Sequence, residues 1–169
     1  MFSFSYAVKA AGRGLVLAAG VVAVPTVVFS VSGCSTSAPA GPSLYTRLGG
    51  HDAIAAVVHD FVGRAAGDPA VNFTRQGIAG APKWDPTPDN LKILEQHLTE
   101  FVCVAAGGPE TYTGRDNKTV HTGMKITDAE FTAIAKDLGL ALDDFKVPQK
   151  EHDELMNAVA GTHDQIVGL

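Results

Sequence analysis

The stretch "GGPETYTGRDNKTVHTGMKI", residues 107–126, decides how the rest of this sequence is interpreted. Two glycines and a proline open it, and a single histidine, His121, stands near its end. Glycine reaches the left-handed backbone conformations that close a helix, so a helix is predicted to stop at Gly107 and Gly108. Whether His121 is an ordinary surface histidine or is held against a partner depends on the helices around this stretch.

Before this stretch, apolar residues recur with helical spacing in two segments. One helix is predicted within residues 48–68, with Asp52 as its N-cap and Gly67 at its end. Another is predicted to run from its N-cap Thr87 to the double glycine, and Pro88 suits its first turn. The apolar stripes of the two helices are Ile54, Val57, Val58, Phe61, Val62 and Ala65, and Leu91, Leu94, Leu98, Phe101, Val102 and Ala105.

Residues 71–88, between these helices, are rich in glycine and proline and are predicted to form a loop with at most a short turn. Later in the chain, Thr127 and Glu130 form a predicted capping box that starts a third long helix, and Pro148 precedes a fourth. No stretch alternates convincingly as a strand, so the sequence predicts an all-α fold. The apolar sides of the last two helices are Phe131, Ile134, Ala135 and Leu138, and Leu155, Val159, Thr162 and Ile166.

Residues 1–33 have the composition of a secretory signal, with a positively charged head followed by an uncharged apolar run. The run ends at "VSGC", which resembles a bacterial lipobox, so cleavage before Cys34 and attachment of lipid to its thiol are expected. Ordinary cleavage near the same place and a retained single anchor are the alternatives. The expected location is the bacterial cell envelope, facing the periplasm or the exterior, with the lipid as the only membrane contact.

Residues 34–42 are small, polar and rich in proline, as in a tether, and one globular domain is predicted over residues 43–169. Without residues 1–33 the chain has 11 basic and 18 acidic residues and a formal charge of −7. Nucleic acid is not an expected partner, because its phosphates demand a positive face. Cys103 lies among apolar neighbours and is expected to be a buried, unreactive thiol, and lipidation of Cys34 would leave it without a disulfide partner.

These features together resemble the truncated haemoglobins of the first group, short globins that fold two helices over two around a haem. The resemblance rests on "SLYTRLGGHDAI" at residues 43–54, on "GGPETYTG" and on the histidine of "VHTG", and it extends to Leu169. It implies a haem cofactor whose iron is bound by His121 on the proximal side. Neutral imidazole is a good ligand for iron. On composition alone, His121 would be a solvated or hydrogen-bonded side chain.

On the distal side of the implied haem, the sequence departs from the family pattern. Phe61 stands where the family has a phenylalanine, but the tyrosine that usually follows it is Val62 here. Leu94 and Leu98 match the positions that face the free side of the iron, one of which is commonly a glutamine. Since valine and leucine cannot donate a hydrogen bond, we do not expect high-affinity oxygen storage.

Two further contacts to the haem are open. In some family members a histidine at the position of His97 becomes the second axial ligand. The alternative, which we favour, is a half-exposed histidine at the haem edge with no bond to iron. Phe73 is the candidate for an aromatic contact to the haem, although Trp84 could fill that role, and Tyr112 is expected to pack.

The resemblance implies binding of diatomic ligands such as oxygen or nitric oxide, or redox chemistry at the haem iron. It leaves open whether the chain is an enzyme, for example a nitric oxide dioxygenase, and an exported enzyme would need an electron donor that the sequence does not identify. The alternative is a haem-free helical lipoprotein that acts as a binding or sensor module, since fold alone does not establish function. The presence of His121 argues against that alternative, and the missing distal tyrosine argues mildly for it.

Overall fold

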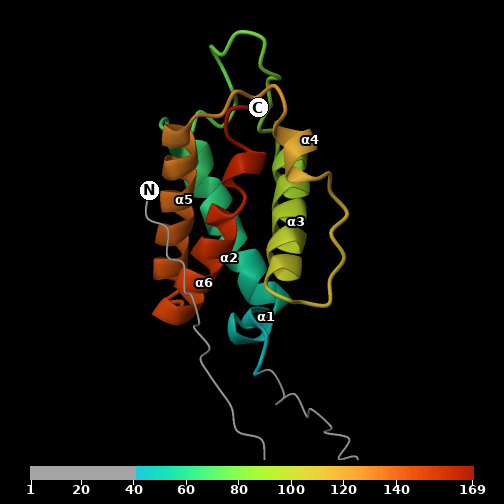
Figure 1. Ribbon diagram of the computed structural model, residues 1–169, viewed down its shortest axis with the longest axis vertical. Helices are drawn as coiled ribbons and strands as arrows, with labels where there is room; N and C mark the ends of the chain where they lie inside the picture. Colours follow the sequence, from blue (N-terminus) through green and yellow to red (C-terminus); the bar gives the residue numbers. More distant parts are fainter. Residues whose placement is uncertain (1–40) are drawn as a thin grey trace, which may run out of the picture. The chain divides into compact units, whose positions relative to one another are not determined.

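The computed structural model describes residues 41–169, so the predicted signal segment, the lipidation of Cys34 and most of the tether lie outside the described residues. Within residues 41–169 the chain contains six α-helices, one 3-10 helix and no strand, which confirms the predicted all-α fold (Figure 1). The helices are α1 (Leu44–Arg47), α2 (His51–Gly67), α3 (Pro88–Ala105), α4 (Asn117–His121), α5 (Asp128–Asp144), α6 (Gln149–Ala160) and η1 (His163–Gln165). None of these helices is both long and apolar enough to cross a membrane.

Local capping chemistry sets the start of two long helices. The Thr87 side chain accepts a hydrogen bond from the amide of Asn90 at 3.2 Å and so begins α3. The predicted capping box begins α5: Thr127 accepts from the amide of Glu130, and the Glu130 carboxylate accepts from the amide of Thr127 at 2.8 Å. Such caps pair amides that a helix leaves unbonded, and each contributes about 1 kcal/mol.

Two predicted helix ends are wrong. The N-cap of α2 is Gly50, whose φ of 80° lies in the left-handed region, whereas Asp52 lies inside the first turn. There the negative charge of Asp52 interacts favourably with the positive end of the helix dipole, rather than through a capping hydrogen bond. The last long helix ends at Ala160, where a glycine follows. Thr162 and Ile166 therefore flank a separate 3-10 turn and do not continue the face of α6.

The core consists of two apolar clusters that share α2. One side of α2 packs on α5 and α6, and its cluster is Val57, Leu138, Ala141, Leu142 and Leu155. The other side packs on α3, and its cluster is Ile54, Val58, Val62 and Cys103. Figure 1 shows α2 running between α3 and α5, and it is packed against both. Adjacent positions of the apolar stripe, such as Val57 and Val58, therefore belong to different walls of the core.

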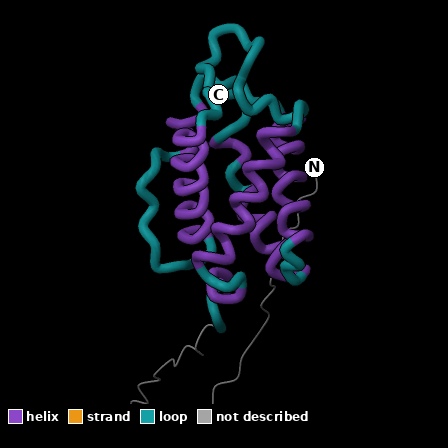
Figure 2. Tube along the Cα trace, turned by 180° about the vertical axis from the view of Figure 1, so that it is seen from behind, coloured by secondary structure: helices purple, strands orange, loops and turns teal. Residues whose placement is uncertain are grey.

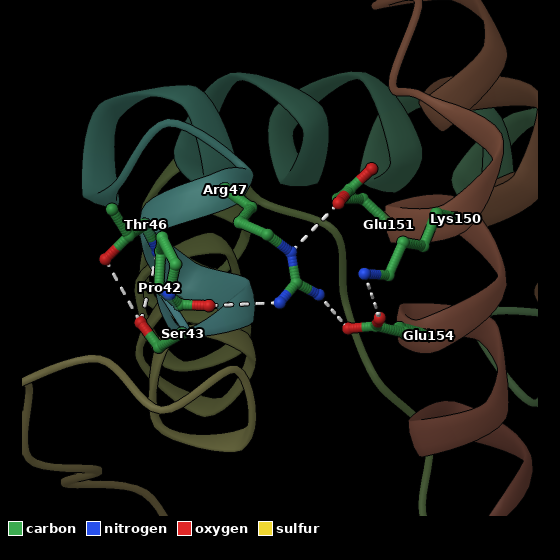
Figure 3. A network of polar contacts seen from close by, with 7 residues as sticks. All are labelled: Pro42, Ser43, Thr46, Arg47, Lys150, Glu151 and Glu154. Atoms are coloured by element: carbon green, nitrogen blue, oxygen red, sulfur yellow. Dashed lines mark hydrogen bonds and ion pairs between the residues drawn. The ribbon is translucent and has the colours of Figure 1, made fainter. Parts of the chain in front are cut away.

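The short helix α1 is fastened to α6 by the guanidinium of Arg47 (Figure 3). It donates to Glu151 Oε1 at 2.9 Å, to the carbonyl of Pro42 at 3.0 Å, and to Glu154. Glu151 is buried, and a buried carboxylate is tolerated only with a partner of this kind. This network ties the beginning of the domain to its last long helix.

The segment between α2 and α3, residues 68–87, contains no helix, in agreement with the loop predicted over residues 71–88. It contains several turns rather than one short turn, and Pro88 is the first residue of α3. Figures 1 and 2 both show it as a projecting loop at the end of the helical domain where the C-terminus lies. Phe73 and Trp84 pack edge to face within it, with ring centroids 5.2 Å apart. Arg75 has a φ of 55°, and its side chain is bonded to residues outside the loop, so contacts with the rest of the domain hold this part of its backbone.

Candidate functional site

His121 is the last residue of α4, a helix of five residues that is capped by Asp116. Its ring Nδ1 lies 2.7 Å from the carbonyl oxygen of Asn117, one turn earlier in the same helix. Because a carbonyl only accepts, this contact makes Nδ1 the donor and leaves Nε2 unprotonated in the neutral ring. No residue in the described part of the chain forms a hydrogen bond with Nε2.

The surroundings of His121 favour the neutral form of the ring. Burial lowers the pKa of His121, and the hydrogen bond to the Asn117 carbonyl opposes this effect only in part. A neutral imidazole with a free Nε2 is the form that binds haem iron, and a carbonyl that holds the other ring nitrogen is typical of histidine ligands. The donor chemistry of His121 therefore fits a haem.

The residues predicted for the distal side are brought together in the structure. Val62 of α2 is 1% exposed and belongs to the second core cluster, against which Phe61, Leu94 and Leu98 pack. Leu94 and Leu98 are four residues apart on α3 and therefore share a face. Phe61, Leu94 and Leu98 are only partly buried, which leaves apolar surface that a haem can cover. We call Val62, Leu94 and Leu98 the apolar wall.

His97 lies beside the apolar wall rather than in it. Its ring stands edge-on to Tyr112, with 6.3 Å between centroids, and Tyr112 also stands edge-on to Phe101 at 5.7 Å. The Tyr112 hydroxyl donates to the carbonyl of Arg115 at 2.7 Å, so this tyrosine packs and closes a turn, as expected. Ligation of iron by His97 and contact of Phe73 with the haem both remain predictions.

The connector that leads to α4, residues 106–116, runs beside α3 (Figures 1 and 2). Glu100 holds it there, because one carboxylate oxygen accepts from the Thr113 amide at 2.9 Å and from the Thr113 hydroxyl at 2.7 Å. The hydrogen bond from Gln96 and those from Thr113 lower the pKa of Glu100 to about 2. Glu100 is therefore a carboxylate at neutral pH and holds the connector on α3.

The double glycine after α3 serves two purposes. Gly107 has a φ of 80°, the left-handed conformation that closes the helix. At Gly108 a Cβ atom would lie 2.6 Å from the ring of Tyr45 and 2.8 Å from the carbonyl oxygen of Cys103. The second glycine is needed because the first segment of the domain passes so close to the end of α3. Cys103 is completely buried, as predicted.

Arg75 was not predicted as a site residue, and it is 4% exposed although it lies in a loop. Its guanidinium is bonded to the turn that follows His121, through partners 49 to 55 residues later in the chain. No pattern among its neighbours in the sequence predicts that a loop arginine is buried. The one feature of the sequence that could have indicated it is an arginine in a loop that has few charged residues.

The chain is similar in sequence to a known family of proteins. The chain matches the bacterial-like globins over residues 43–167. It is 34% identical over 118 residues to a group 1 truncated hemoglobin of Mycolicibacterium paratuberculosis, and the match covers 70% of this chain and 79% of that protein.

Solved structures have the same fold. Truncated hemoglobin from Tetrahymena pyriformis in its Fe(III) form matches with a TM-score of 0.64 at 23% identity, over 76% of this chain and 100% of that one. The 2/2 hemoglobin of a Synechococcus species, solved in the cyanomet state with covalently attached heme, matches with a TM-score of 0.63 at 28% identity and the same coverage. These matches confirm the predicted two-over-two fold and the haem cofactor. The chain belongs to the bacterial-like globin family and is a haem-binding truncated haemoglobin of group 1.

Proposed function

We propose that this globin binds a diatomic ligand, such as oxygen or nitric oxide, at a haem iron held by His121. The observation that carries the proposal is the geometry of His121, whose Nδ1 is held by Asn117 while Nε2 is free. When bound, haem supplies the iron at which such ligands are held or reduced. The chain supplies the proximal nitrogen and the apolar wall. The haem-free alternative gains no support, because the family binds haem and His121 keeps its ligating nitrogen available.

The apolar wall determines how firmly a ligand is retained. None of its three side chains can donate a hydrogen bond to a ligand that carries partial negative charge. Donors on the distal side are one of the features by which haem proteins select oxygen binding over other chemistry. A wall without donors supports brief binding of oxygen or nitric oxide rather than oxygen storage. Redox turnover at the same site would require an electron donor supplied by another protein or a small molecule.

Absorption spectroscopy of the full chain, with haem supplied, tests the proposal. The reduced, haem-loaded protein should change its spectrum when carbon monoxide, nitric oxide or oxygen is added, and oxygen should leave quickly on dilution into buffer without oxygen. A spectrum that responds to none of the three gases would contradict the proposal. The same titration in the presence of candidate reductants would then separate simple binding from turnover.

We also propose, from the sequence, that Cys34 carries a lipid that anchors the protein in the cell envelope. "VSGC" and the residues before it lie outside the described part of the chain. Mass spectrometry of the mature N-terminus should find the lipid on Cys34, and Cys34→Ser should lack it. Stable anchoring takes more than one acyl chain, so a thioether-linked lipid with a further chain is expected. An unmodified Cys34, or cleavage at another residue, would contradict this proposal.

A further inference from the structure

One buried guanidinium joins the loop at residues 68–87 to the turn that follows His121. Arg75 donates from Nε to the carbonyl of Met124 at 3.0 Å. Its other two nitrogens donate to Glu130 Oε1 at 2.6 Å and to the carbonyl of Lys125 at 3.1 Å. All three partners lie between the end of α4 and the first turn of α5. The planar guanidinium therefore holds two consecutive carbonyls of this turn at the same time.

Glu130 couples the same turn to α5. One of its carboxylate oxygens faces Arg75, and the other accepts from the Thr127 amide at 2.8 Å and from the Thr127 hydroxyl at 2.9 Å. A buried charge is tolerated only when it is paired and hydrogen-bonded, so Arg75 and Glu130 hold each other in place. The start of α5 is therefore a rigid support for the guanidinium.

Lys125 strengthens the connection from the opposite direction. Its ammonium donates to the carbonyl of Ala79 at 2.7 Å, so the loop and the turn each donate to the other. Its backbone amide donates to the carbonyl of Leu169 at 2.8 Å. Lys125 and Arg75 have φ values of 53° and 55°, in a region that residues with a Cβ rarely adopt. Such backbone persists only where several contacts determine it together.

The turn is bonded directly to the proximal histidine. The amide of Met124 donates to the carbonyl of His121 at 3.0 Å, while the carbonyl of Met124 accepts from Arg75. A five-residue helix such as α4 is too short to hold its own orientation, so its packing against η1 and the contacts at its two ends orient it. Asp116 caps the first end, and the turn held by Arg75 follows the second.

We infer that Arg75 is a positioning residue for the proximal ligand. By holding the peptide of Met124, it sets the direction in which His121 presents Nε2 to the iron. This inference rests on the proposed role of His121. It also gives the loop a function, because the loop carries a guanidinium from the end of α2 to the proximal side of the haem.

The test compares Arg75→Lys with Arg47→Lys in the full chain loaded with haem. Arg47 is the control because its guanidinium, like that of Arg75, donates to a carboxylate on another helix and to a backbone carbonyl (Figure 3 shows Arg47). The Arg47 side chain is 26% exposed and that of Arg75 is 4% exposed. Lysine keeps the positive charge but cannot reach several partners from a planar fork. None of the partners of Arg47 lies in α4 or in the turn after it.

In Arg75→Lys, the iron–histidine stretching band of the reduced protein, measured by resonance Raman spectroscopy, should shift or broaden. Transfer of haem to an acceptor globin should become roughly tenfold faster, the lower end of the effect of losing a group that orients a metal ligand. Hydrogen exchange of the amides at residues 122–126 should increase in the haem-free protein. In Arg47→Lys all three measurements should match the wild type.

A second variant covers the case in which Arg75→Lys does not fold. Glu130→Gln preserves the cap of α5, since glutamine serves in a capping box, but removes the charge that faces Arg75. Like Arg75→Lys, Glu130→Gln should shift or broaden the iron–histidine band and should make haem transfer faster. Unchanged values in both variants, or an equal change in Arg47→Lys, would overturn the inference.

His121→Ala separates this inference from the proposed function. If that variant keeps the iron–histidine band, the proximal assignment is wrong, and the effect of Arg75 on the iron is wrong with it. If His121→Ala loses the band while Arg75→Lys and Glu130→Gln keep it unchanged, the proposed function stands and only the inference on Arg75 fails.

Discussion

The apolar wall and the turn after α4 are held together by different forces. Val62, Leu94 and Leu98 are placed by packing on a core in which Val62 is 1% exposed. The turn is placed by hydrogen bonds from Arg75 and Lys125. Burial of apolar area has no preferred direction, whereas a hydrogen bond weakens steeply with angle. Apolar packing therefore suits a surface that lacks hydrogen-bond donors. Directional hydrogen bonds suit a turn that orients a ligating nitrogen, such as Nε2 of His121.

This difference predicts which substitutions each region tolerates. In the apolar wall, the shape and polarity of the side chains matter, so introducing a hydroxyl or an amide should alter stability or ligand release even where the new side chain fits. In the turn, the geometry of the hydrogen-bond donors matters, so a substitution that keeps the positive charge but removes the planar guanidinium should alter the orientation of its partners.

His121→Ala should abolish haem binding or weaken it severely, because the proximal bond to iron is lost. Stability should fall as well, since a cofactor present at a thousand times its dissociation constant contributes about 4 kcal/mol. The Soret band on haem titration and the free energy of unfolding measure the two effects. His59→Ala is the matched control, because the His59 side chain is 78% exposed. An unchanged Soret band in His121→Ala would show that another residue is the proximal ligand of the iron.

Val62→Thr should destabilise the haem-free protein by about 1–3 kcal/mol, because a hydroxyl would be moved from water into an apolar cluster, where the acceptor within reach is the carbonyl one turn earlier in α2. Val104→Thr is the control: Val104 lies on α3 and is 42% exposed, so its hydroxyl would be hydrated. Urea denaturation of both variants gives the comparison. Equal stabilities for the two variants would show that the wall is open to water.

Leu98→Gln should slow oxygen dissociation about fivefold, because one added hydrogen bond is worth about 1 kcal/mol and is lost when oxygen leaves. Stopped-flow measurement of oxygen release from the reduced protein checks this. His97→Ala should leave both the rate and the ferric spectrum unchanged if His97 stays beside Tyr112. A six-coordinate low-spin ferric spectrum that becomes high-spin in His97→Ala would show instead that His97 is the second axial ligand.

The smallest effect is expected at His163, the first residue of η1, which lies against the start of α5. Its ring lies 3.0 Å from Asp164 and 2.9 Å from Asp128, and these two carboxylates raise its pKa. A raised folded-state pKa stabilises the protein below the unfolded value of about 6.5, and this contribution is lost as pH rises through the folded value. The Tm difference between wild type and His163→Gln should therefore shrink with rising pH. A difference that grows with pH would contradict the pairing.

The sequence predicted those features that depend on neighbours in the chain. The caps at Thr87 and Thr127 were correct, because a capping side chain meets an amide only three residues away. The cap at Asp52 was wrong because Gly50, two residues earlier, adopts the left-handed backbone that places it at the start of α2. The grouping of Val62 with Leu94 and Leu98 came from family resemblance and agrees with their packing.

By itself, the sequence determined the all-α class, the long helices and a histidine behind a double-glycine stop, since helical periodicity and capping act over three or four residues. Only the tertiary structure decided that Nδ1 of His121 is held while Nε2 is free, and that His97 stands against Tyr112. It alone assigned Arg75 to the turn after α4. The physical reason is distance along the chain: the partners of Arg75 lie 49 to 55 residues away, and an arginine in a loop has the same local pattern whether it faces water or a buried carbonyl.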